Sequence, residues 1–226
     1  MNEEEKNNFN QTANQVKDEF KESAKDVSET FKNVNIKEDS VATGHFVKDM
    51  IFHPIEKVKE VANSEDGNYL KYAIIIIALY CIAGLMGTLD ILFKDYYTLG
   101  GKISNIISST ISPLLTVLIP AIVIMFVPGG NKKSLMKILL PLVTICFVPS
   151  VAAKYLTIIP FVDSIRLLSI PLSAIRGVLY DFSVVLCFVA ITELYKNDTD
   201  GNKSFVKYAL VFGIAAIIQS IILIFI

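Results

Sequence analysis

The sequence is poor in the residues that build metal and catalytic centres. Its two histidines, His45 and His53, stand eight positions apart, without a cysteine or second carboxylate at ligand spacing. A metal-binding pair on one helix face would stand four residues apart. No HExxH, GxSxG or phosphate-binding GKS/T pattern occurs anywhere in the 226 residues. We therefore expect no metal, no cofactor and no enzymatic activity.

Cysteine and arginine are also scarce. The three cysteines, Cys81, Cys146 and Cys187, lie in apolar stretches, and their odd number is typical of buried free thiols rather than of disulfides. Two arginines against 19 lysines, together with frequent Ile and Asn, favour a bacterial, AT-rich source. No apolar segment precedes residue 73, so the sequence predicts no signal peptide.

Long uncharged runs dominate the rest of the chain. Residues 1–71 carry a net charge of −5, whereas residues 72–226 carry +4 spread between apolar runs. About 20 apolar residues in a helix cross the roughly 30 Å of hydrocarbon in a bilayer. This pattern excludes a soluble enzyme or nucleic-acid binder for the larger part of the chain and predicts an integral membrane protein.

The runs predict an all-α, polytopic bundle of five transmembrane helices. We place the spans at about 72–93, 103–127, 136–157, 167–192 and 208–226, within a membrane domain of residues 44–226. With the N-terminus inside the cell, nine Lys and Arg residues flank the spans on the inner side and four on the outer side. The positive-inside rule then predicts a cell-membrane protein with a cytoplasmic N-terminus and an extracytoplasmic C-terminus.

The polar head, residues 1–43, contains an 11-residue repeat. Eleven residues make three turns of 3.67 residues, so the repeated apolar positions form one narrow stripe along a helix. The stripe residues that define a candidate interaction helix are Phe9, Val16, Phe20, Val27 and Phe31. Such a helix lies on a membrane surface, pairs with another helix, or serves as a solvated tether.

A polar linker is expected at 34–44, followed by one short amphipathic helix at 46–62 next to the first span. Pro54 is suited to the first position of a helix, and Ile55, Val58 and Val61 follow at helical spacing. We therefore expect this helix to lie in the membrane interface.

Ionisable residues inside the spans form the other candidate site. A charge at the bilayer centre costs roughly 2.5–3.5 kcal/mol, so such residues are usually paired or functional. Asp181 lies deepest, and Arg176 precedes it by five residues toward the outer end of the fourth span. Asp90 lies at the outer end of the first span. Five residues is a poor spacing for a pair on one helix. Three alternatives are open: a structural pair between Asp90 and Arg176, a proton or cation relay through Asp181, and placement of these charges at the membrane interface.

The segment Phe52-His53-Pro54-Ile55-Glu56, a polar head before it and five spans after it resemble the Yip family of Ypt/Rab-interacting membrane proteins. The resemblance covers residues 46–226 and implies a five-span fold with a cytoplasmic head. In eukaryotes that family is associated with Rab-type GTPases and vesicle traffic, and its bacterial members have no assigned function. The 11-residue repeat departs from the family pattern.

Two functions fit these features. The first is a non-enzymatic scaffold or adaptor whose N-terminal helix recruits a protein partner or senses the inner leaflet. The alternative is a small transporter or lipid-handling protein that uses Asp90, Arg176 and Asp181. The expected partners are the lipid bilayer, a protein at the cytoplasmic helix and a second copy of the chain, but no nucleic acid.

Overall fold

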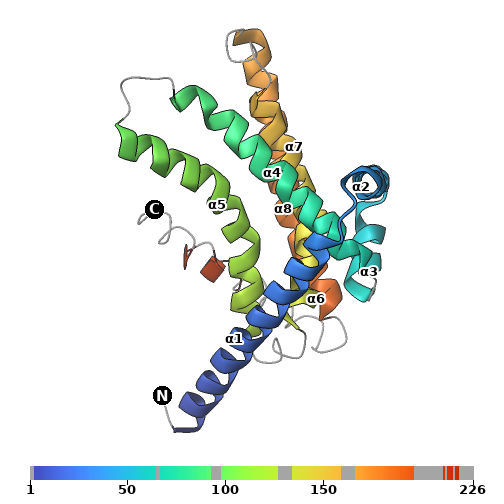
Figure 1. Cartoon of the computed structure of the whole chain (residues 1–226), viewed down its shortest axis with the longest axis vertical. Helices are drawn as coiled ribbons and strands as arrows, with labels where there is room; N and C mark the ends of the chain where they lie inside the picture. The colour runs from blue at the N-terminus through green and yellow to red at the C-terminus, as the bar shows by residue number, and fades with distance from the viewer. Residues whose placement is uncertain are drawn as a thin grey trace.

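Every regular element in the described part of the chain is a helix, which confirms the all-α prediction (Figure 1). The computed structural model describes residues 3–64, 67–92, 98–126, 134–158, 166–195, 211, 213–215 and 217–218. Helices occupy four of the five predicted span positions. Of the fifth position, 208–226, the structure describes residues 211, 213–215 and 217–218.

The long apolar helices are α4 (Asn68–Leu92), α5 (Leu99–Met125) and α8 (Arg166–Leu194). A further rod is made of α6 (Leu135–Pro141), a π-helical turn η2 (Leu142–Cys146) and α7 (Phe147–Ile158). Among the described residues, three segments are long and apolar enough to cross a membrane, namely Asn68–Thr88, Leu135–Leu156 and Ile170–Leu194. The chain is therefore a membrane-embedded helical protein.

The rod α6–η2–α7 forms the centre of the bundle. Its apolar window is 67% buried, against 28% and 22% for the windows of α4 and α8. Ile138, Leu142, Ile145 and Cys146 are almost completely inaccessible. Lipid tails are as apolar as these side chains, so close packing and interhelical hydrogen bonds must hold the helices together.

The π-helical turn lies between Pro141 and Pro149. Pro149 has no N–H group and cannot donate to the carbonyl of Ile145, so the regular α-helical ladder is interrupted here. At this turn the Ser183 hydroxyl of α8 donates to the carbonyl of Cys146 and accepts from Ser150 Oγ at 3.0 Å. The irregular backbone is thereby joined to the neighbouring helix.

The head consists of α1 (Glu3–Lys32), α2 (Ile36–Phe52) and α3 (Pro54–Asn63). The predicted linker at 34–44 is wrong, because most of it lies in α2. Asn35 caps this helix by accepting from Glu38 N at 3.5 Å, and Asp39 Oδ2 accepts from Asn35 N at 2.8 Å. These reciprocal bonds satisfy N–H groups that the first turn leaves without partners.

The single helix predicted at 46–62 is also wrong, because His53 separates α2 from α3. The predicted role of Pro54 is confirmed: it occupies the start of α3, where its missing N–H costs no helical hydrogen bond. Both helices pack on the bundle, α2 against α4 and α3 against α8 and α6.

Successive apolar helices run in alternating directions. The starts of α4 and α6 and the end of α5 all contact α1, and the end of α8 contacts α3. We call this end of the bundle, marked by Leu70, Phe126, Leu135 and Glu193, the head end.

Candidate functional site

Helix α1 crosses the head end of the bundle instead of running beside one helix (Figure 1). Near its start, the Phe9 ring lies 5.5 Å from the ring of Phe126, just after α5. In its middle, Glu19 Oε2 accepts from the backbone N of Leu135, the first residue of α6, at 2.5 Å. Val27 then shares a cavity with Leu70 of α4. One helix therefore contacts three others in the order α5, α6, α4.

The contact between Glu19 and Leu135 has a clear electrostatic basis. The first N–H groups of a helix have no partner within it, and they carry the positive end of the helix dipole. Glu19 satisfies the N–H of Leu135, and Ser134 Oγ accepts from Lys137 N at 3.3 Å. Two side chains from different parts of the sequence thus cap α6, and one of them fixes α1.

The apolar stripe of α1 faces the bundle but is only partly covered. Val16 packs against the core, whereas Phe9, Phe20, Val27 and Phe31 are 54%, 49%, 39% and 67% exposed. Incomplete coverage of a continuous stripe means that the bundle alone does not shield it from its surroundings.

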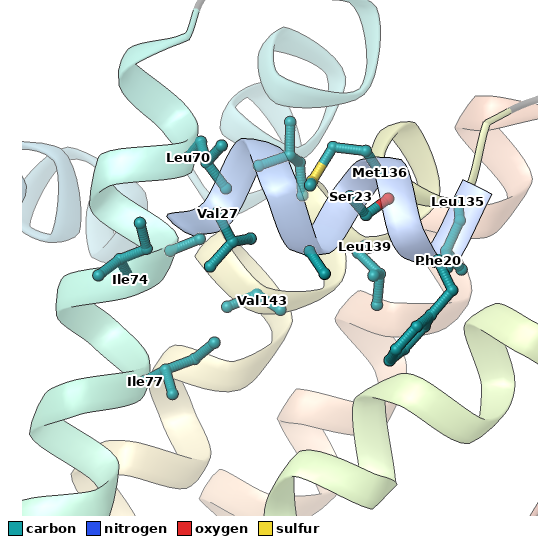
Figure 2. A pocket seen from close by; sticks show the side chains of 13 residues that line it. Phe20, Ser23, Val27, Leu70, Ile74, Ile77, Leu135, Met136, Leu139 and Val143 are labelled. Carbon is teal, nitrogen blue, oxygen red and sulfur yellow. The ribbon is translucent and has the colours of Figure 1, made fainter. Parts of the chain in front are cut away.

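An apolar cavity of about 320 Å³ lies under α1. In Figure 2, Val27 and Phe20 extend from α1 toward Val143 and Leu139, while Ile77 approaches from α4. Ser23 of α1 supplies the one polar side chain among the lining residues, and the others are aliphatic or aromatic. The cavity therefore suits an apolar occupant.

The remainder of the head is fixed by an aromatic and ionic cluster. The Phe46 ring stacks on Tyr72 and meets Tyr69 edge-on, with ring centroids 5.2 and 5.8 Å away. Glu60 Oε2 accepts from Lys57 Nζ at 2.7 Å, and its Oε1 accepts from Tyr69 Oη at 2.5 Å. These two bonds stabilise the carboxylate and lower the pKa of Glu60 against the opposing effect of burial.

Two further contacts join the head to the bundle. Lys71 Nζ of α4 lies 3.4 Å from Asp39 Oδ1 of α2. Asn63 Nδ2, at the end of α3, donates to Glu193 Oε1 of α8 at 3.2 Å. Consequently α2 and α3 form a platform on the head end.

The predicted intramembrane residues do not converge in the described part of the chain. Arg176 Nη2 donates to Ser173 Oγ at 3.0 Å on its own helix. The side chain of Asp181 is exposed on α8, and that of Asp90 lies outside the described residues. The pair between Asp90 and Arg176 stays a prediction.

Sequence reasoning missed Glu19 and Glu60, two of the carboxylates that hold the head. Glu19 is one of eight acidic residues in the first 32, and nothing in its spacing distinguishes it from the others. Glu60 gains its role only because the fold brings Tyr69 back against α3. Of the five predicted stripe residues, four contact the bundle or line the cavity, namely Phe9, Val16, Phe20 and Val27, whereas Phe31 is 67% exposed.

Comparison of the chain with protein-family models, curated proteins and solved structures gave no match.

Proposed function

We propose that this protein is a non-enzymatic, multi-pass membrane adaptor whose N-terminal helix α1 lies in the cytoplasmic interface of the cell membrane. Helix α1 and the platform of α2 and α3 would together sense the inner leaflet and recruit a cytoplasmic protein partner. The single observation that carries this proposal is the path of α1 across the ends of α5, α6 and α4, with its apolar stripe toward the bundle.

The position of α1 supports an interfacial role. A helix that crosses the ends of membrane spans is in the plane where headgroups and acyl chains meet. There an apolar stripe enters hydrocarbon and the charged face stays in water, as in other interfacial helices. The partly exposed rings of Phe9, Phe20 and Phe31 would then be covered by lipid.

Five spans with the head inside complete the proposed topology. Helix α5 has 27 residues and packs beside α4, which supports a span there in addition to the three apolar windows. The segment 208–226 would be the fifth and would carry the C-terminus to the extracytoplasmic side. The resemblance to bacterial members of the Yip family agrees with this arrangement and remains part of the proposal.

The depth of α1 can be tested with tryptophan, because the chain contains none. We expect Phe20→Trp in lipid vesicles to emit at short wavelength and to be quenched by brominated acyl chains. Glu22→Trp, on the opposite face of the same helix, should be quenched by aqueous iodide instead. If iodide quenches both variants equally, α1 does not lie in the interface and the proposal fails.

The adaptor role needs a separate test in cells. Crosslinking should identify a protein that co-purifies with the full chain but not with a deletion of residues 1–42. Unchanged localisation, partners and phenotype after this deletion would eliminate the adaptor.

Asp181 supports the transporter alternative, because its carboxylate is exposed on an apolar helix where a charge is unfavourable. A flux in proteoliposomes that Asp181→Asn abolishes would favour this alternative. Flux no greater than that of empty liposomes would exclude it.

A further inference from the structure

We propose that the cavity beneath α1 binds one acyl chain of an anionic phospholipid from the inner leaflet, with the lipid phosphate held by lysines on one side of α1. This inference rests on the interfacial position of α1 proposed above and names the ligand of that surface.

The cavity continues into the bundle. A second cavity of about 240 Å³ shares three lining residues with the first, Ile77, Leu139 and Val143, and extends to Phe147 of α7. The shared residues make the two cavities adjoining parts of one groove. Every residue that lines the second cavity is apolar, so Ser23 of the first cavity is the one polar side chain among the residues that line the groove.

The length of the groove matches one leaflet. From Leu135 to Phe147 the rod rises by at most about 18 Å at 1.5 Å per residue, because the π-helical turn η2 rises less per residue than an α-helix. Half of the roughly 30 Å hydrocarbon layer is about 15 Å. The groove therefore extends from the head end to the middle of the bilayer, which is the path of a single acyl chain.

The charged side chains of α1 are separated by sign. At about 100° per residue, the lysines all project roughly 40–140° to one side of Phe20. These exposed lysines are Lys6, Lys17, Lys21, Lys25 and Lys32. The acidic residues between positions 6 and 32 lie on the remaining faces, and they are Asp18, Glu19, Glu22, Asp26 and Glu29. We call the first group the lysine flank.

The lysine flank explains why the net negative charge of the head does not prevent binding to an anionic lipid. Glu19 points to α6 on the opposite side of the stripe, so the flank faces away from that contact. Lys17 and Lys21 stand three residues before and one residue after Phe20, which lines the cavity. Lysine stems can lie along apolar surface while their ammonium groups reach a headgroup phosphate.

A protein helix does not fit this space. A helix with its side chains is about 10–12 Å across, so a single helical turn would already exceed the volume of the cavity beneath α1. Its volume of about 320 Å³ lies within the usual range for a small apolar ligand. The apolar lining of the groove, its length of one leaflet and the lysine flank beside it together favour a phospholipid as the occupant.

The test uses full-length Phe20→Trp protein in nanodiscs of zwitterionic lipid that contain a small fraction of either brominated phosphatidylglycerol or brominated phosphatidylcholine. We expect the anionic lipid to quench more efficiently per molecule, by roughly fivefold for each lysine engaged. Adding Lys17→Gln and Lys21→Gln should remove this preference. The matched acidic changes Glu22→Gln and Asp26→Asn should preserve it.

A second variant tests the cavity. Ala24→Phe narrows the space from α1, outside the spans, so the bundle should fold as before. It should reduce quenching by both brominated lipids, and the retained phospholipid detected by native mass spectrometry should fall in parallel.

If quenching shows no headgroup preference and does not change with Ala24→Phe, the lipid site is overturned, while α1 still lies in the interface. Quenching of Phe20→Trp by aqueous iodide would instead overturn the interfacial position itself. The failure of the inference and the failure of the proposed function thus give different signals.

Discussion

Glu60 joins α3 to the start of α4 through one carboxylate. Lys57 and Tyr69 both bond to its charged form and lower its pKa below the ordinary value of 4.5. A depressed folded-state pKa gives stability that is complete above about pH 4.5 and is lost as the pH falls through the folded-state value. Because this side chain is 47% exposed, solvent screening limits the effect to about 1 kcal/mol.

We therefore expect Glu60→Gln to lower the thermal unfolding temperature at pH 7 and to behave like the wild type near pH 3. Unfolding scans in detergent across this pH range measure the difference. Glu56→Gln is the control, because its side chain is 81% exposed. A Glu60→Gln deficit that does not shrink at low pH would contradict the assignment.

Ser183 joins α8 to the central rod of the bundle, as Glu60 joins α3 to α4 in the head. Its hydroxyl donates to the Cys146 carbonyl and accepts from Ser150. Interhelical hydrogen bonds in membrane proteins contribute about 0.6 kcal/mol on average and about 1.7 at most. Ser183→Ala should destabilise the bundle by an amount in this range when unfolding in mixed micelles is measured. Ser173→Ala removes only an exposed hydrogen bond to Arg176 within the same helix and should change little; equal effects would refute the specific role of Ser183.

At the scale of the element, the attachment of α1 depends on a charge at the start of α6. Glu19→Ala removes an acceptor from a helix N-terminus, which costs about 0.5–2 kcal/mol. The population with α1 released should rise several-fold, and trypsin should cleave faster after Lys21 and Lys25, because cleavage follows the open population. Glu22→Ala is the matched control on the exposed face. Identical cleavage rates for the two variants would show that Glu19 does not hold α1.

The same helices show what sequence patterns can predict. The stripe of α1 and the start of α3 at Pro54 follow from spacing and from the missing N–H of proline, which are local properties. The linker expected at 34–44 is wrong because the polar composition of this segment does not reveal the helix cap that Asn35 provides. The cavity could not be predicted, since its walls come from α1, α4 and α6, and no single segment encodes their separation.

At the scale of the whole molecule, the apolar helices were predictable because crossing hydrocarbon requires a minimum length of uncharged chain. The central position of α6–η2–α7 was not, because its prolines and short first segment make it the least regular of the predicted spans. The fold places this irregular rod where Ser183 of the neighbouring helix α8 satisfies the carbonyl of Cys146. The alternating directions of the helices then bring the head contacts to one end.

Because the helices alternate in direction, we expect two glycines to be exposed on opposite sides of the membrane. Gly67 precedes α4 at the head end, and Gly100 lies at the start of α5 at the other end; each is exposed with open space around a new side chain. In a chain with its three cysteines changed to alanine, Gly100→Cys should react with a membrane-impermeant maleimide in intact cells. Gly67→Cys should react only after permeabilisation. The reverse pattern would invert the proposed topology, and labelling of both in intact cells would refute a spanning α4.

The same assay determines the number of spans. A cysteine appended after Ile226 should react in intact cells together with Gly100→Cys if residues 208–226 cross the membrane. If those residues do not cross, the appended cysteine stays on the side of Gly67 and reacts only after permeabilisation. The end of α8 is fixed at the head end by the bond between Asn63 and Glu193. The location of the appended cysteine therefore depends only on the segment that follows α8, and it decides directly between four and five spans.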